Sequence, residues 1–158
     1  MIVVDANVII YLIRETLFTP MAQELYIADN CWAVPHLWEA EVLNGLLMEV
    51  RAGTLDIQDA IQASSSASTI LSGNVHNCNQ SAVLRTAKDS GLTAYDAYYV
   101  TLARSLGVFL VTEDKQIKNR CPDVARSLNS YLTSFGKNTG IREKPAVYNI
   151  RKGRKKNP

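Results

Sequence analysis

A helix and a strand follow one another in one stretch of this chain, Thr93-Ala-Tyr-Asp-Ala-Tyr-Tyr-Val-Thr-Leu-Ala-Arg-Ser-Leu-Gly-Val-Phe-Leu-Val-Thr-Glu-Asp114. Thr93 is a good N-cap, and small and apolar residues recur after it at steps of three and four, as on one face of a helix. Gly107 is a suitable end for this helix, and residues 108–111 form the short apolar run that is typical of a buried strand. The stretch therefore predicts a helix that leads into a strand ending near Asp114.

The same alternation of short apolar runs and amphipathic segments continues outward in both directions. Besides 108–111, we expect strands at 2–4, 31–34, 74–76 and 124–126. We expect the other helices at 7–14, 20–28, 36–51, 55–71, 81–90, 114–120 and 129–135. Strands that alternate with helices pair in parallel through right-handed crossovers. The sequence therefore predicts an α/β fold, a three-layer α/β/α sandwich with a central, mainly parallel five-stranded sheet.

The composition is that of an ordinary globular protein. The chain has 158 residues, of which 47% are hydrophobic and 20% are charged, and this length suits one folded domain. No apolar run approaches the roughly 18 residues of a membrane span. Asp5 comes too early for a signal peptide, which needs a basic segment followed by an apolar one. We therefore expect a cytoplasmic protein without a membrane span.

Cysteine and histidine do not form a recognisable metal or redox motif. Cys31, Cys78 and Cys121 contain no C-x-x-C pair, and as an odd number they cannot all pair with one another. His36 and His76 are equally scattered and lack the spacing of a zinc site. We expect reduced, structural thiols and no structural zinc.

The net charge of +2 hides an uneven distribution. Residues 137–158 hold eight Lys and Arg residues against one Glu, a balance of +7, so residues 1–136 carry −5. This compositional break predicts a folded domain over 1–136 and a basic, flexible C-terminal tail over 137–158. Attraction of RNA and docking of a partner are the alternatives to a merely solvated tail.

Acidic residues stand where the predicted strands end or the helices begin. Asp5 ends the first strand, Asp114 follows the strand at 108–111, and Asp96 lies in the first turn of the helix that leads to it. The carboxyl ends of parallel strands share one edge of the sheet, where ligands bind in such folds. Carboxylates that converge there repel one another and need a countercharge, for which a hard divalent cation such as Mg²⁺ is suited.

Each acid also has a purely local interpretation. Asp5 and Asp114 can be helix N-caps, and Thr93-x-x-Asp96 resembles a capping box. Taken singly, each is better explained as a cap, but caps need not converge and these positions do. A fourth acid comes from the helix at 36–51, where Glu39 and Glu41 lie about 200° apart around the axis, so helical phase alone does not choose between them.

The chain resembles the PIN-domain nucleases, and among them the VapC-type toxins of type II toxin–antitoxin systems, along essentially all of residues 1–136. The resemblance rests on the order and spacing of Val3-Val-Asp-Ala-Asn-Val, Pro35-His-Leu-Trp-Glu-Ala-Glu-Val-Leu-Asn-Gly-Leu, Leu92-Thr-Ala-Tyr-Asp-Ala-Tyr-Tyr-Val-Thr-Leu-Ala and Val111-Thr-Glu-Asp-Lys. It places the family's acids at Asp5, Glu41, Asp96 and Asp114, and so selects Glu41 over Glu39. Asn7 and Thr112 match polar positions that flank the metal site. The basic tail after Gly136 departs from the pattern.

This resemblance implies a divalent-metal-dependent endoribonuclease that cleaves single-stranded or loop RNA with Mg²⁺ (or Mn²⁺), leaving a 5′-phosphate and a 3′-hydroxyl. Asp5, Asp96 and Asp114 would bind the metal, and Glu41 would bind it or orient the water. Asn7 and Thr112 would hold the metal ligands or the waters in place without binding the metal themselves. A cognate antitoxin and a homodimer are implied as well. A PIN nuclease of RNA processing without an antitoxin and a catalytically silent RNA-binding module are the alternatives.

Aromatic and basic residues also lie near the acids in the sequence. Helical spacing favours core packing for Tyr98 and Tyr99, whereas Tyr95 precedes Asp96 and is better placed to lie near a cleft. Lys115, directly after Asp114, and the basic cluster at 151–156 are candidates for contacts with phosphate.

Overall fold

The sheet at the centre of the molecule is parallel throughout. The computed structural model describes residues 1–139, and the side chains of residues 1–136. Five strands pair in the order β3-β2-β1-β4-β5, and all four neighbouring pairs are parallel. They are β1 (Ile2–Val4), β2 (Trp32–Pro35), β3 (Val75–His76), β4 (Leu110–Val111) and β5 (Ala125–Arg126). The predicted five-stranded sheet is confirmed.

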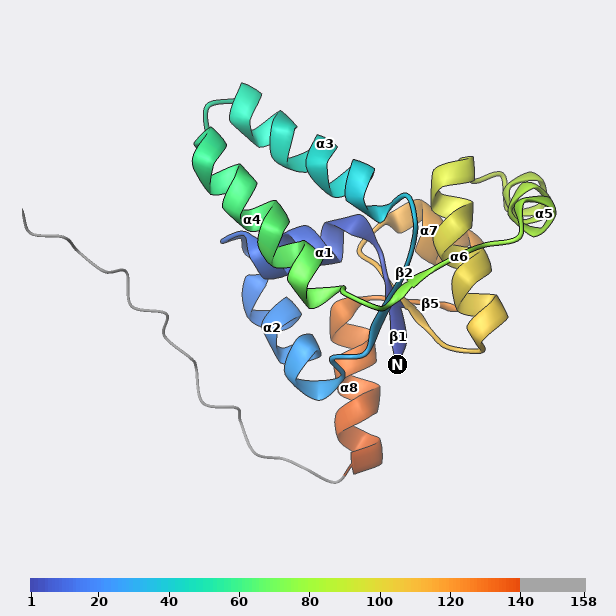
Figure 1. Cartoon of the computed structure of the whole chain (residues 1–158). Helices are drawn as coiled ribbons and strands as arrows, with labels where there is room; N and C mark the ends of the chain where they lie inside the picture. The colour runs from blue at the N-terminus through green and yellow to red at the C-terminus, as the bar shows by residue number, and fades with distance from the viewer. Residues whose placement is uncertain (140–158) are drawn as a thin grey trace, which may run out of the picture.

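Helices cover both faces of this sheet (Figure 1). In the described part of the chain they are α1 (Ala6–Ile13), α2 (Thr19–Ala28), α3 (Trp38–Arg51), α4 (Ile57–Ile70), α5 (Gln80–Ser90), α6 (Ala94–Leu106), α7 (Lys115–Arg120) and α8 (Leu128–Thr139). One core joins the sheet to α1, α2, α3, α4 and α8, and a second core joins it to α6 and α7. Helix α5 packs on α6. The three-layer α/β/α sandwich is therefore confirmed.

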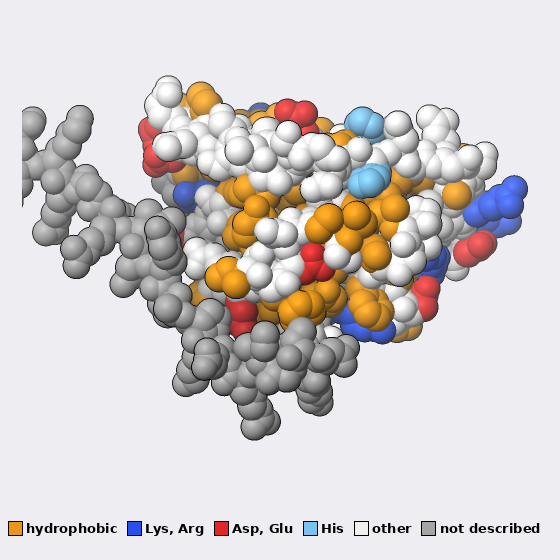
Figure 2. Space-filling view, turned by 60° about the horizontal axis from the view of Figure 1, so that its bottom comes forward, with side chains coloured by type: hydrophobic (Ala, Val, Ile, Leu, Met, Phe, Trp, Pro, Cys, Tyr) orange, Lys and Arg blue, Asp and Glu red, His pale blue; other side chains and the backbone are white. Residues whose placement is uncertain are grey.

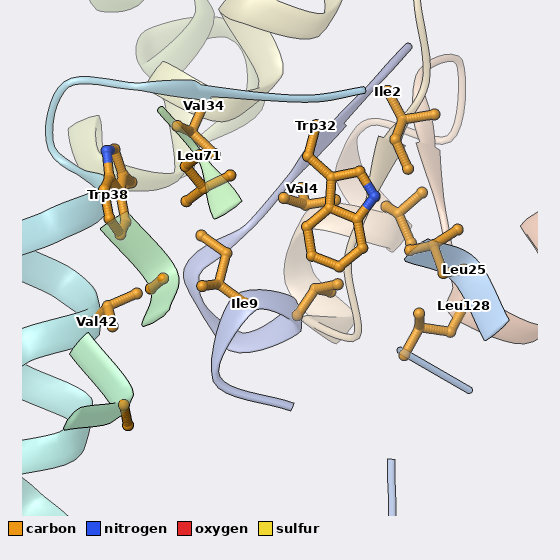
Figure 3. Packing of buried hydrophobic residues seen from close by; sticks show 14 of the residues in the cluster. Ile2, Val4, Ile9, Leu25, Trp32, Val34, Trp38, Val42, Leu71 and Leu128 are labelled. Carbon is orange, nitrogen blue, oxygen red and sulfur yellow. The ribbon is translucent and has the colours of Figure 1, made fainter. Parts of the chain in front are cut away.

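Strand β1 shows why its sequence is apolar at every position. Ile2 and Val4 face the first core, whereas Val3 faces the second, and all three are at most 1% exposed. A strand covered on both faces reads as a continuous apolar run rather than an alternating one. Figure 3 shows Ile2 and Val4 packed around Trp32, with Ile9 and Leu25 beside them. This packing holds the end of β1 and the start of α1 in place on the sheet.

Helix α3 packs against α1. Gly45 lies at this contact, where an added Cβ would fall 2.5 Å from Cδ1 of Ile10, so a side chain there would require Ile10 to shift. Further along the same pair of helices, an ion pair joins Arg14 to Glu49 at 3.0 Å. These contacts set the position of α3, and with it Glu41, relative to the start of α1.

Some element boundaries differ from the predicted ones. Strand β4 begins at Leu110 rather than at 108, because the N–H of Val108 completes the end of α6 by donating to Ala103 O at 3.0 Å. Strand β2 runs from Trp32 to Pro35, one residue later at each end than the predicted 31–34. Helix α8 runs from Leu128 to Thr139, past the compositional break at Gly136. Most of the predicted tail, residues 140–158, lies outside the described residues.

The surface carries many exposed apolar side chains. Leu17, Ile27, Leu84 and Tyr95 are each more than 60% exposed. On the face shown in Figure 2, hydrophobic side chains are spread between isolated acidic and basic ones. No helix within residues 1–139 is long and apolar enough to cross a membrane. The cytoplasmic location stays a prediction.

Candidate metal-binding active site

The candidate acids lie at the carboxyl edge of the sheet. From β1 the chain crosses to β2 on one side, and it returns later to β4 on the other side, so β1 and β4 flank the point where the strand order reverses. Ligands bind at such a switch point in open α/β sheets. Helices α1, α3 and α7 begin at this edge because they follow β1, β2 and β4, and α6 begins there because it leads back to the start of β4 (Figure 1).

Asp5 is a buried carboxylate with two different hydrogen-bond donors. It is 5% exposed, and its Oδ1 accepts from the N–H of Val8 at 3.0 Å, which makes Asp5 the N-cap of α1. Its Oδ2 accepts from the hydroxyl of Thr112. Burial raises the pKa of Asp5 to about 6; the two hydrogen bonds oppose the shift, and the charges of Asp114 and Glu41 add to it.

Thr112 connects Asp5 to Asp114. Its fully buried hydroxyl donates to Asp5 and accepts from the N–H of Asp114 at 2.9 Å. Asp114 in turn caps α7, because its Oδ1 accepts from the N–H groups of Gln116 and Ile117 at 2.6 and 2.9 Å. One hydroxyl thus holds the end of β1 next to the start of α7.

Glu41 enters the site from α3. It is half-buried, and its Oε2 accepts a hydrogen bond from the hydroxyl of Tyr99, whereas Glu39 is exposed. Burial raises the pKa of Glu41, the bond from Tyr99 lowers it, and the charge of Asp96 raises it again. The structure therefore turns Glu41, and not Glu39, toward the other acids.

Asp96 lies in the first turn of α6 and takes part in its cap. Its N–H donates to Thr93 Oγ1 at 3.2 Å, and the Thr93 hydroxyl donates back to Asp96 Oδ2 at 2.7 Å. Its negative charge helps to raise the pKa values of Glu41 and Tyr99. The capping interpretation is thus right for Asp5, Asp96 and Asp114 as local structure, and it does not prevent the three from gathering.

Within residues 1–136 the four carboxylates form one electrostatic group without a cationic partner. The charges of Asp114 and Glu41 raise the pKa of Asp5, and the charge of Asp96 raises the pKa of Glu41. None of the four forms an ion pair with a side chain of residues 1–136. Elsewhere Asp29, Glu49, Glu113 and Asp123 each have a cation within 2.8 to 3.0 Å.

The chemistry of this group fits a hard divalent cation. Its donor atoms are all carboxylate oxygens, which Mg²⁺ and Mn²⁺ prefer. A cation would also offset the charges of Asp114 and Glu41, which add to the effect of burial in raising the pKa of Asp5. As they stand, no three His, Cys, Asp or Glu side chains in the described part of the chain are arranged to hold a metal ion, so the acids would have to close around one.

Comparisons with known proteins identify the family of this chain. The profile of the PIN domain matches residues 2–121, a range that contains all four acids. The chain belongs to the PIN-domain family. Over 87 residues it is 37% identical to a protein named Exonuclease VapC9 from Pyrobaculum aerophilum. That alignment covers 54% of this chain and 63% of the relative, so the chain spans less than two thirds of the relative's length.

A solved structure shares the fold of this PIN domain. The crystal structure of PAE2754 from Pyrobaculum aerophilum superposes with a TM-score of 0.66 at 26% sequence identity. The superposition covers 85% of this chain and 88% of the other. The resemblance to the PIN family on the four sequence blocks is therefore confirmed.

The remaining expected residues of this PIN domain differ in their placement. Asn7 is exposed in the first turn of α1 and is not hydrogen-bonded to any of the acids, so only Thr112 of the two flanking positions reaches them. Tyr99 is only 2% exposed, as the predicted core packing implies, but the hydrogen bond from its hydroxyl to Glu41 was not predicted. The available signal was its spacing: Tyr99 follows Asp96 by three residues and so lies on the same face of α6.

Proposed function

We propose that this protein is a divalent-metal-dependent ribonuclease whose catalytic residues are Asp5, Glu41, Asp96 and Asp114. The observation that carries the proposal is a group of four carboxylates at one edge of the sheet, each close enough to feel the charge of at least one other, without a cationic partner in residues 1–136. Such a group costs stability unless it serves to bind a cation. Membership of the PIN-domain family supports the same chemistry.

Each residue has a definite task in this proposal. Asp5, Asp96 and Asp114 bind Mg²⁺ (or Mn²⁺), and Glu41 binds it or orients the attacking water. When bound, the cation supplies Lewis acidity, which activates the water and offsets the charge of the scissile phosphate. Thr112 donates a hydrogen bond to one oxygen of Asp5, so the carboxylate of Asp5 cannot rotate freely.

We propose single-stranded or loop RNA as the substrate, cut internally to leave a 5′-phosphate and a 3′-hydroxyl. Two exposed side chains next to the acids support contact with such a strand. Tyr95 precedes Asp96 and is 66% exposed, and aromatic rings stack on unpaired bases. Lys115 follows Asp114 and is exposed, and it can contact a phosphate. Because the relative is named an exonuclease, internal cleavage must be distinguished from cleavage at an end.

We further propose that the protein is the toxin of a VapBC-type pair, held inactive by a cognate antitoxin, and that it forms a homodimer. The VapC name of the relative supports this extension. Ribonuclease activity without an antitoxin would instead place the protein in RNA processing. Co-expression with the product of a neighbouring gene, followed by co-purification, separates the two cases.

The nuclease site is tested by incubating a single-stranded RNA and a hairpin RNA, labelled at either end, with wild type and Asp96→Asn. Mg²⁺, Mn²⁺ and EDTA are compared. Wild type should cut with either metal and not in EDTA, and Asp96→Asn should lose more than the roughly 10–100-fold expected for a residue that only supports a metal ligand. Fragments of intermediate length that carry either label indicate internal cleavage, whereas single nucleotides released from one end indicate an exonuclease.

Asp59→Asn is the matched control. Asp59 occupies the third helical position of α4 after the N-cap Asp56, just as Asp96 follows Thr93 in α6. The exchange should therefore reproduce the small effect on the helix end and leave cleavage intact. A folded wild type that neither cleaves RNA nor binds Mn²⁺ would contradict the proposal and leave the acids as helix caps.

A further inference from the structure

One hydrogen bond in the site joins the two helical layers of the molecule. Tyr99 belongs to α6, which packs on the second core, and Glu41 belongs to α3, which packs on the first. The Tyr99 hydroxyl donates to Glu41 Oε2 across 58 positions of sequence. The bond therefore passes over the carboxyl edge of the sheet from one layer to the other.

The phenol can act toward Glu41 only as a donor. A tyrosine hydroxyl has an ordinary pKa of about 10, so it carries its proton at neutral pH and donates a hydrogen bond to the carboxylate. A neutral donor binds one carboxylate oxygen without cancelling the charge, which a Lys or Arg at the same place would do.

The bond also restricts a side chain that would otherwise be mobile. A glutamate on a helix has three rotatable bonds, and fixing one of its oxygens removes most of that freedom. Oε2 is engaged by Tyr99, while Oε1 accepts no hydrogen bond from the described residues. Glu41 is thus oriented in advance, with one oxygen held and one left for a ligand.

We infer that Tyr99 is a positioning residue of the site, whose hydroxyl orients the carboxylate of Glu41 for the bound cation and its water. This inference rests on the metal-dependent reaction proposed above and assigns it one more residue. The aromatic ring of Tyr99 has a separate, structural task, because it packs with Leu92, Val100 and Leu102 in the second core. Replacement by phenylalanine keeps the ring and removes only the donor.

The test compares Tyr99→Phe with Tyr98→Phe in the full chain. Tyr98 is its neighbour on α6, is half-buried, and makes no side-chain hydrogen bond within residues 1–136, so it is the matched loss of a hydroxyl. Mn²⁺ affinity is measured by calorimetry, and kcat and KM are measured for cleavage of a single-stranded RNA. Tyr99→Phe should weaken Mn²⁺ binding about 10–100-fold and lower kcat by a similar factor at unchanged KM. Tyr98→Phe should leave Mn²⁺ affinity, kcat and KM within about twofold of wild type.

A second background shows whether Tyr99 acts through Glu41. In Glu41→Ala the acceptor is gone, so adding Tyr99→Phe should not weaken Mn²⁺ binding further. An equal loss in both backgrounds would overturn the inference, because it would show an action independent of Glu41. Wild-type affinity and kcat in Tyr99→Phe would overturn it as well.

A third variant covers the case in which Tyr99→Phe does not fold. Glu41→Asp keeps the charge on the half-buried face of α3 but shortens the side chain by one methylene, which draws the carboxylate back from the Tyr99 hydroxyl. It should show the same weakened Mn²⁺ binding, and wild-type affinity would overturn the inference. A wild type that binds no Mn²⁺ overturns the proposed function and this inference together, whereas the preceding outcomes overturn the inference alone.

Discussion

The carboxylate of Asp5 accepts from Val8 with one oxygen and from Thr112 with the other. The first bond is a local helix cap that could be predicted from the sequence, since Val8 follows three residues later. The second comes from a residue 107 positions away and depends on the pairing of β1 with β4. At the scale of one residue, the same carboxylate therefore serves both as helix cap and as part of the site: one oxygen caps α1, and the other is bound by Thr112.

The raised pKa of Asp5 predicts how stability depends on pH without metal. Its pKa is about 6 in the folded protein against 3.8 ordinarily, so the folded state holds this proton more tightly. The contribution of Asp5 to stability is therefore present below about pH 4 and is lost as pH rises through about 6. Asparagine keeps the cap but cannot ionise. In EDTA, the unfolding free energy of Asp5→Asn relative to wild type should rise between pH 4 and 7, by up to about 3 kcal/mol.

Denaturant unfolding at several pH values measures this difference. Asp56→Asn is the control, because Asp56 caps α4 through Gln58 on the exposed surface and is not among the site acids. Its difference from wild type should vary little over the same range. If the difference between Asp5→Asn and wild type did not change between pH 4 and 7, the hydrogen bonds of the ionised carboxylate would offset the cost of burying it.

At the scale of elements, Thr112 holds together the end of β1, the end of β4 and the start of α7. Thr112→Val keeps the shape and removes the hydroxyl. It leaves Asp5 without one donor and the N–H of Asp114 without its acceptor. We expect a loss of about 1–3 kcal/mol in unfolding free energy, measured with denaturant in EDTA.

Thr112→Ser is the control for this change, because serine retains the hydroxyl. Its cost should stay below about 1 kcal/mol, since it removes only one methyl group. If the valine variant were as stable as the serine variant, the hydroxyl would not support the arrangement of these elements.

The elements themselves could be predicted well, and the contacts between them less well. Periodicity located the strand Ile2–Val4 and the helix Ala94–Leu106 because these patterns depend only on which faces are buried. The start of β4 was wrong by two residues because Val108 serves the cap of α6, which no apolar pattern reports. The contact of Tyr99 with Glu41 depends on how α3 and α6 approach each other across the sheet, and helical phase alone left Glu39 as an equal candidate.

At the scale of the whole molecule, cation binding should be visible as stability. A ligand that binds only the folded state stabilises it by about 2.7 kcal/mol at a concentration of 100 times its Kd. We therefore expect Mg²⁺ or Mn²⁺ to raise the melting temperature of wild type above its value in EDTA. The rise should be smaller in Asp96→Asn, because one of the carboxylates has lost its charge.

Sodium chloride at matched ionic strength is the control for this experiment. It screens the repulsion among the acids but cannot bridge them, so it should raise the melting temperature less than the divalent cation does. An equal rise with either salt would show that screening alone explains the effect, and that no cation is held at the site.

The position of β4 within the sheet has a consequence for how the protein is made. Asp5 leaves the ribosome with the earliest strand, but its partners Thr112 and Asp114 follow β4, which pairs with β1 on the side away from β2. Synthesis runs from the N-terminus, so the carboxylates can meet only when most of the described chain has emerged. Under the ribonuclease function proposed above, this order means that an unfinished copy carries no complete site and cannot cut its own message.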